Sequence, residues 1–125
     1  MSKLTYVAGR RFDKRLVWLG RGVHSPPFSP AGRISAGYRL RLLQRGEPLG
    51  MPHSRPMPTI GPRCHELRVR DDEHFWRLVY RIDVDAIVIV EVFDKQSRQT
   101  PRQMIDLCRK RLRAYDERAA EGEGE

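Results

Sequence analysis

Three stretches of β-strand pattern, separated by short acidic turns, set the strongest limit on how this chain folds. Residues 64–70 (CHELRVR) and 74–82 (HFWRLVYRI) alternate between two kinds of side chain, as half-buried strands do. Residues 86–93 (AIVIVEVF) are nearly all apolar, which is typical of a strand covered on both faces. The turns are too short for a crossover, so the sequence predicts a three-stranded antiparallel meander.

The alternation also sorts the side chains of the first two strands onto two faces. The predicted apolar face carries His65, Leu67, Val69, Trp76, Leu78, Tyr80 and Ile82. If helices cover that face, Arg68 and Arg70 share the open face with Arg77 and Arg81. Guanidinium groups keep their charge, so four of them would bind phosphates and stabilise charge rather than act as bases. The alternative is an ordinary solvated half of an antiparallel sheet.

A first helix is predicted over residues 30–45, because Ser29 can cap it, Pro30 suits its first position and Gly46 its end. Its expected apolar face consists of Ile34, Tyr38 and Leu42, joined by Ala31, Leu40 and Leu43. The opposite face carries Arg33, Arg41 and Arg45. That basic stripe is either a solvated face or a docking surface for an acidic partner or RNA.

Weaker patterns precede and follow this helix. Residues 14–19 predict a first strand, and residues 46–62, with five prolines and three glycines, predict no regular element. That long loop either wraps over the sheet or binds a ligand.

A last helix is predicted from the capping box of Thr100, Pro101 and Gln103. Its apolar stripe would be Met104 or Ile105, then Cys108, Leu112 and Tyr115. The fold class is therefore α+β, with helices on one face of a small sheet. We expect one domain over residues 1–116 and a disordered acidic tail over residues 117–125.

Composition favours a cytoplasmic protein that binds a polyanion. The 24 basic residues exceed the 16 acidic ones by eight, and 20 of the 24 are arginine. Residues 1–70 hold 14 basic and 3 acidic side chains. An arginine-rich codon usage is the alternative reading. Two cysteines in unrelated contexts make no disulfide framework, and no apolar run reaches the length of a membrane span.

The end of the third strand adds a second cationic group. Phe93 and Lys95 alternate onto one face, and Arg98 follows in a polar loop. A ring beside two cations suits single-stranded nucleic acid, although ordinary solvated charges at a strand end would look the same. The histidines and cysteines show no ligand spacing, so we expect no metal and no cofactor.

These motifs together resemble the RelE/ParE superfamily of bacterial toxins, and within it the phage-derived, HigB-like branch. The resemblance is carried by HELRVR, WRLVYRI, an apolar strand ending in FDK and a helix that begins with TP, and it spans roughly residues 14–116. It implies a curved antiparallel sheet with an N-terminal helix on one side and a C-terminal helix. It also implies a type II toxin that cuts mRNA on the ribosome.

The resemblance also implies roles and partners. By the resemblance, Arg68, Arg77 and Lys95 would be catalytic. The strand faces and the polar loop, read above, add Arg70, Arg81, Phe93 and Arg98 as expected RNA contacts. The partners would be mRNA, the ribosome and an antitoxin of helix-turn-helix type from the adjacent gene. Gln96 departs from the family's second lysine, and no tyrosine follows Lys95 in the loop. The alternatives are therefore a ParE-like toxin that binds DNA gyrase and a catalytically silent interaction module, and His65, Glu66 and Glu91 leave the general base open.

Overall fold

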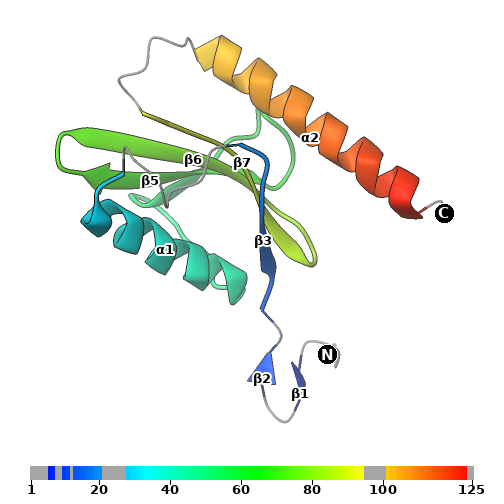
Figure 1. Ribbon diagram of the computed structural model, residues 1–125, viewed down its shortest axis with the longest axis horizontal. Coiled ribbons are helices and arrows are strands. Elements are labelled where there is room, and N and C mark those ends of the chain that lie inside the picture. Colours follow the sequence, from blue (N-terminus) through cyan, green and yellow to red (C-terminus); the bar gives the residue numbers. More distant parts are fainter. Residues whose placement is uncertain (1–5, 8–9, 12, 21–27, 95–100, 124–125) are drawn as a thin grey trace.

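The computed structural model describes residues 6–7, 10–11, 13–20, 28–94 and 101–123 (Figure 1). Its elements in chain order are β1 (Tyr6–Val7), β2 (Arg10–Arg11), β3 (Arg15–Trp18), α1 (Pro30–Gln44), β4 (Ser54–Pro56), β5 (Cys64–Asp71), β6 (His74–Ile82), β7 (Ala86–Asp94) and α2 (Pro101–Glu123). Strands β3 to β7 form one sheet in the order β3-β7-β6-β5-β4, and β1 pairs with β2 separately. The α+β class and the antiparallel β5–β6–β7 meander are as predicted.

The two edges of the sheet differ from the expectation. Strand β3 is parallel to β7, with Arg15 opposite Ala86, so the sheet is not wholly antiparallel. Strand β4 forms inside the segment for which no regular element was predicted, and it pairs with β5. It is three residues long and ends at Pro56. Proline is tolerated on an edge strand because no further strand needs its missing N–H.

Helix α1 begins as predicted, and its first turn is fastened to the sheet. The hydroxyl of Ser29 accepts a hydrogen bond from the Gly32 amide at 3.0 Å. The amide of Ser29 donates a hydrogen bond to the carboxylate of Asp71 at 2.9 Å, and the Ser29 hydroxyl donates to the same carboxylate. Trp76 Nε1 also donates to this carboxylate, at 3.2 Å. Burial pushes the pKa of Asp71 up, but these hydrogen bonds outweigh it and lower the pKa.

The predicted apolar face of α1 is only partly right: Leu40 and Leu43 are buried as expected, but Ile34 and Tyr38 are not. The buried positions are Gly32, Ala36, Leu40 and Leu43. Ile34 and Tyr38 are 74% and 61% exposed. The reason is close approach: a Cβ at Gly32 would lie 2.4 Å from a carboxylate oxygen of Asp71, so only glycine fits where α1 meets β5.

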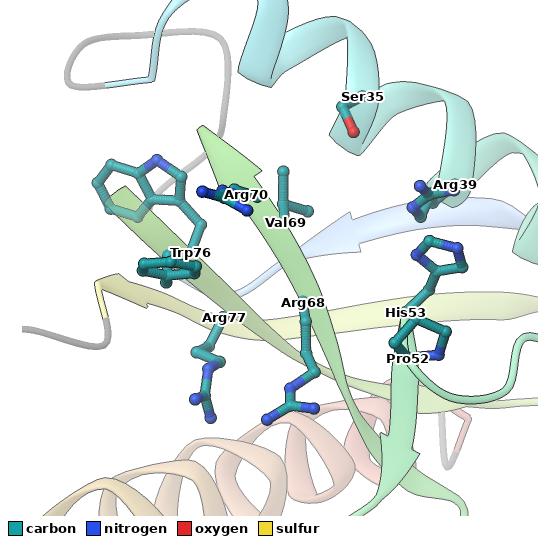
Figure 2. Close-up of a pocket in the computed structure, with 10 residues that line it drawn as sticks. Ser35, Arg39, Pro52, His53, Arg68, Val69, Arg70, Trp76 and Arg77 are labelled. Atoms are coloured by element: carbon teal, nitrogen blue, oxygen red, sulfur yellow. The ribbon is translucent and has the colours of Figure 1, made fainter. Parts of the chain in front are cut away.

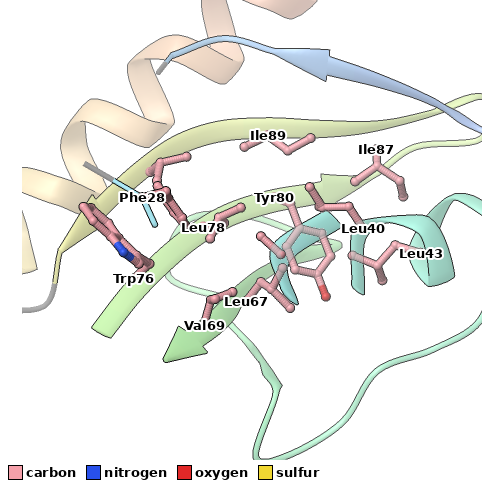
Figure 3. Close-up of a cluster of buried hydrophobic side chains, with 12 residues drawn as sticks. Phe28, Leu40, Leu43, Leu67, Val69, Trp76, Leu78, Tyr80, Ile87 and Ile89 are labelled. Atoms are coloured by element: carbon pink, nitrogen blue, oxygen red, sulfur yellow. The ribbon is translucent and has the colours of Figure 1, made fainter. Parts of the chain in front are cut away.

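The two helices cover opposite faces of the sheet, which corrects the expectation that one face is open (Figure 1). On the α1 side, Leu40 and Leu43 pack with Leu78, Tyr80 and their neighbours (Figure 3). On the α2 side the cluster is Ile60, Cys64, Val79, Ala86, Val88, Val90, Met104, Cys108 and Leu112. Because β7 places apolar side chains on both faces, each face needs a cover.

Helix α2 presents the predicted stripe to the sheet. Met104, Cys108 and Leu112 are buried, and burial raises the pKa of the Cys108 thiol to about 12. Thr100 of the predicted capping box lies outside the described residues. The helix continues to Glu123, so the prediction of disorder fails for residues 117–123, where alanine, arginine and glutamate favour helix. Neither described helix is long and apolar enough to cross a membrane.

Candidate functional site

The register of the meander brings two predicted catalytic residues together. Arg68 on β5 lies opposite Arg77 on β6, and Arg77 lies opposite Phe93 on β7. Figure 2 shows that the side chains of Arg68 and Arg77 point the same way, away from α1. Two like charges directly across a strand pair repel each other, so the pair needs a counter-charge.

Glu66 supplies that counter-charge from beneath the arginines. Its side chain is 3% exposed. Its Oε1 accepts hydrogen bonds from Arg77 Nη1 at 2.9 Å and from Arg55 Nε at 3.0 Å, and Arg68 Nε lies 3.9 Å away. A buried carboxylate is tolerated only with such partners. Glu66 therefore positions the arginines, and its bonded oxygen is not available as a general base.

Arg55 is a member of this cluster that sequence reasoning missed. Strand β4 places it directly opposite Glu66. A strand of three residues inside a proline-rich loop has no detectable alternation, so no periodicity could reveal it. We call Arg55, Glu66, Arg68 and Arg77 the arginine cluster. Its three cations face one anion, which leaves an excess positive charge suited to a phosphate.

A cavity of about 510 Å³ lies beside the cluster, at the part of β5 that extends beyond its pairing with β4 (Figure 2). It is lined by Ser35, Arg39, Pro52, His53, Arg68, Val69, Arg70, Phe75, Trp76 and Arg77. Four of these residues are arginines, and none of the described lining residues is acidic. The cavity therefore offers its cationic groups to an anionic ligand.

His53 lines the cavity and is a second residue of the site, after Arg55, that sequence reasoning missed. Its carbonyl accepts a hydrogen bond from the Arg68 amide at 2.8 Å, which fixes the His53 backbone against β5. Figure 2 shows its ring and the side chain of Arg39 converging on the α1 side of the cavity. A histidine in an irregular loop carries no sequence signal of its own.

The other proposed general bases are occupied. Glu91 Oε1 lies 3.0 Å from Arg111 Nη1 on α2, in an ion pair. His65 stacks on Tyr80, with ring centroids 5.3 Å apart, on the α1 side of the sheet as expected. Neither lines the cavity.

Arg81 is not brought to the cluster. It is 9% exposed and donates to the carboxylates of Asp83 and Asp116 at 2.8–3.0 Å. The hydrogen bonds with Asp116 raise the pKa of Arg81. Burial opposes this shift, and the hydrogen bonds with Asp83 add to it. Arg81 therefore ties β6 to α2, and its guanidinium is already saturated with carboxylates.

The remaining predicted contacts divide into three cases. Arg70 is exposed and lines the cavity, with its guanidinium carbon 5.6 Å from the centre of the Phe75 ring. Phe93 is only partly exposed and packs against the cluster under α2, so it is not the open ring that was expected. Lys95 and Arg98 lie outside the described residues.

An ion pair closes the end of the sheet next to the cavity. His74 Nδ1 lies 2.6 Å from Asp94 Oδ2, joining the first residue of β6 to the last residue of β7. The hydrogen bond with Asp94 raises the pKa of His74. The His74 ring also stacks on Trp76, which lines the cavity.

These features define a class: a small α+β domain with an arginine-lined cavity at one edge of a mostly antiparallel sheet. Residues 27–113 match the family described as phage-derived protein Gp49-like (DUF891). The chain belongs to this family, which is part of the RelE/HigB-like toxin clan. No curated protein and no solved structure matches the chain.

Proposed function

We propose that this chain is the toxin of a type II toxin–antitoxin pair and inhibits translation by ribosome-dependent cleavage of mRNA. One observation carries the proposal: Arg68 and Arg77 are paired across β5 and β6 over a buried glutamate, beside a cavity lined by four arginines. Membership of the toxin clan supports the same class of activity.

In the proposed reaction, a ribose 2′-hydroxyl attacks the adjacent phosphorus and the bond to the 5′ oxygen breaks. The products are a 2′,3′-cyclic phosphate and a 5′-hydroxyl end. Negative charge builds on the phosphate oxygens, where Arg68 and Arg77 would stabilise it. Because Glu66 holds Arg77 in place by a hydrogen bond, with Arg68 at 3.9 Å from the same oxygen, little reorganisation is needed when substrate arrives.

Two protons must also move in this reaction. Among the described lining residues, His53 carries the side chain best suited to take the proton of the 2′-hydroxyl. Lys95, which follows the last described residue of β7, is proposed to hold the backbone or to protonate the leaving oxygen. Arg70 and Arg98 are proposed as additional RNA contacts.

The test is cleavage of a defined mRNA in a translation extract, with the new ends mapped. The wild-type chain should produce 5′-hydroxyl ends, and Arg68→Gln should lower the rate by about 10²–10³-fold. Arg118→Gln is the matched control, because it removes the same charge from an exposed position on α2. Equal loss in both variants, or no cleavage by the wild type, contradicts the proposal. Gyrase-dependent DNA damage without RNA cleavage would establish the ParE-like alternative instead.

The proposed partner is a cognate antitoxin, of the helix-turn-helix kind, encoded by the adjacent gene. Expression of the chain alone should arrest growth, and co-expression of the neighbouring gene should restore it. Normal growth at clearly detectable levels of folded protein would contradict a toxin of either kind.

A further inference from the structure

Phe75 is a large apolar side chain that the fold does not bury. It is 41% exposed and belongs to neither buried cluster. Its neighbour Trp76 faces the other way, is 3% exposed and stacks on Phe28 with ring centroids 4.3 Å apart. Trp76 is therefore part of the core, whereas Phe75 keeps part of its ring at the surface.

Arg70 lies against the ring of Phe75. The two residues are opposite each other at the hairpin end of β5 and β6, and the guanidinium carbon lies 5.6 Å from the ring centre. Both line the cavity that Arg68 and Arg77 also line. An aromatic ring with an arginine beside it is the combination on which unpaired nucleobases stack.

The spacing along the strands relates this pair to the arginine cluster. Arg70 and Phe75 are each two residues from Arg68 and Arg77, so the two cross-strand pairs share one face about 7 Å apart. This distance is on the scale of a single nucleotide. We propose that Phe75 and Arg70 form a stacking platform for an unpaired base whose adjoining phosphate is held by Arg68 and Arg77.

This inference rests on the proposed function, and it adds the substrate requirement that an accessible, unstacked base must enter the cavity. RNA whose bases are paired or missing should lose this contact while it keeps its phosphates. Every nucleobase has a π-face that can stack on an aromatic ring, so binding to the platform should not depend on which base is bound.

The experiment measures the affinity of the full chain for a short single-stranded RNA and for the same RNA with abasic residues. Phe75→Ala should weaken binding of the base-bearing RNA by roughly 10-fold and leave binding of the abasic RNA unchanged. Phe75→Trp should restore the affinity, and Phe75→Leu should not. Arg68→Gln should weaken binding of both RNAs.

The outcomes separate this inference from the proposed function. If Arg68→Gln weakens RNA binding but Phe75→Ala does not, the platform is overturned and the proposed function still stands. An equal loss for both RNAs in Phe75→Ala also overturns it, because Phe75 would then only orient Arg70 toward a phosphate. If the wild-type chain binds neither RNA, the platform fails, and cleavage in the translation extract decides the proposed function separately.

Discussion

Arg68 and Arg77 face each other across two strands, but the fold holds them unequally. The side chain of Arg77 is 13% exposed and bonded to Glu66, whereas that of Arg68 is 34% exposed and 3.9 Å from the same oxygen. The alternation of β6 predicts only that Arg77 points away from the α1 side. It does not reveal the buried glutamate beneath it, so Arg77 has a structural role besides the catalytic one proposed.

We therefore expect different stability costs from the two truncations. Arg77→Ala should lower the free energy of unfolding by about 1–3 kcal/mol, because buried Glu66 loses its least exposed donor. Arg68→Ala should change it by less than about 1 kcal/mol, since that pair is longer and partly solvated. Urea denaturation of both variants measures the difference. Equal costs would show that Glu66 does not discriminate between the two arginines.

A second prediction at this scale concerns pH. The hydrogen bond with Asp94 raises the pKa of His74 in the folded chain, so the folded state binds this proton more tightly than the unfolded state. The stabilisation is complete below the unfolded pKa of about 6.5 and is lost as pH rises through the raised folded value. His74→Gln should therefore melt below the wild type at pH 5.5, and the gap should narrow by pH 9. A gap independent of pH would contradict a protonated His74–Asp94 pair.

The rotation of helix α1 is the main feature at the element scale that the sequence misassigns. Ile34, Tyr38 and Leu42 are four apart and predict one buried face, but the helix instead buries two small residues, Gly32 and Ala36, together with Leu40 and Leu43. Glycine and alanine carry little weight in a hydrophobic pattern, although they allow α1 to approach β5 closely. The Ser29–Asp71 contact that fixes this orientation joins residues 42 apart, and no local pattern encodes it.

Substitutions on α1 test this orientation directly. Ile34→Gln should change the free energy of unfolding by less than about 0.5 kcal/mol, because the side chain is exposed. Leu40→Ala should cost about 2–5 kcal/mol, because it leaves a cavity against the sheet. Thermal or urea denaturation compares the two variants. A large loss for Ile34→Gln with little for Leu40→Ala would contradict this orientation of α1.

The strands show how much of the fold and the site the sequence does contain. The meander was predictable because its alternation and its short turns are local signals, and the pairing of Arg68 with Arg77 follows from it. The apolar pattern of β7 indicated cover on both faces, yet four arginines on the neighbouring strands suggested an open one. The structure satisfies both the apolar strand β7 and the arginines beside it. Helix α2 covers the second face and buries Arg81, while Arg68 and Arg77 lie beside the cavity. Contributions from Arg55 and His53 were not predictable, because irregular segments have no period.

At the scale of the whole molecule, the excess of eight positive charges predicts affinity for polyanions but not where they bind. The arginine cluster and the cavity place that affinity at one edge of the sheet in our proposal. The basic stripe of Arg33, Arg41 and Arg45 lies on α1 and its C-cap, and none of these three residues lines the cavity. Salt dependence distinguishes the two locations.

RNA binding should follow counterion release, with a slope of about −0.7 in log K against log salt for each phosphate neutralised on a single strand. Three or four contacts give a slope of roughly −2 to −3. Arg68→Gln should flatten the slope by about one contact, and the triple change of Arg33, Arg41 and Arg45 to Gln should leave it unchanged. The reverse result would move the RNA-binding face to α1.

The parallel pairing of β3 with β7 has a consequence for the order in which the chain folds during synthesis. Residues 15 and 86 are partners, so the first strand of the sheet waits until nearly all of the domain has left the ribosome. The contacts of the β5–β6 hairpin are local and close early, whereas contacts between distant segments form late. Arg68, Arg77 and Glu66 all lie on that hairpin. The nascent chain therefore assembles the centre of its arginine cluster before β3 joins the sheet beside β7.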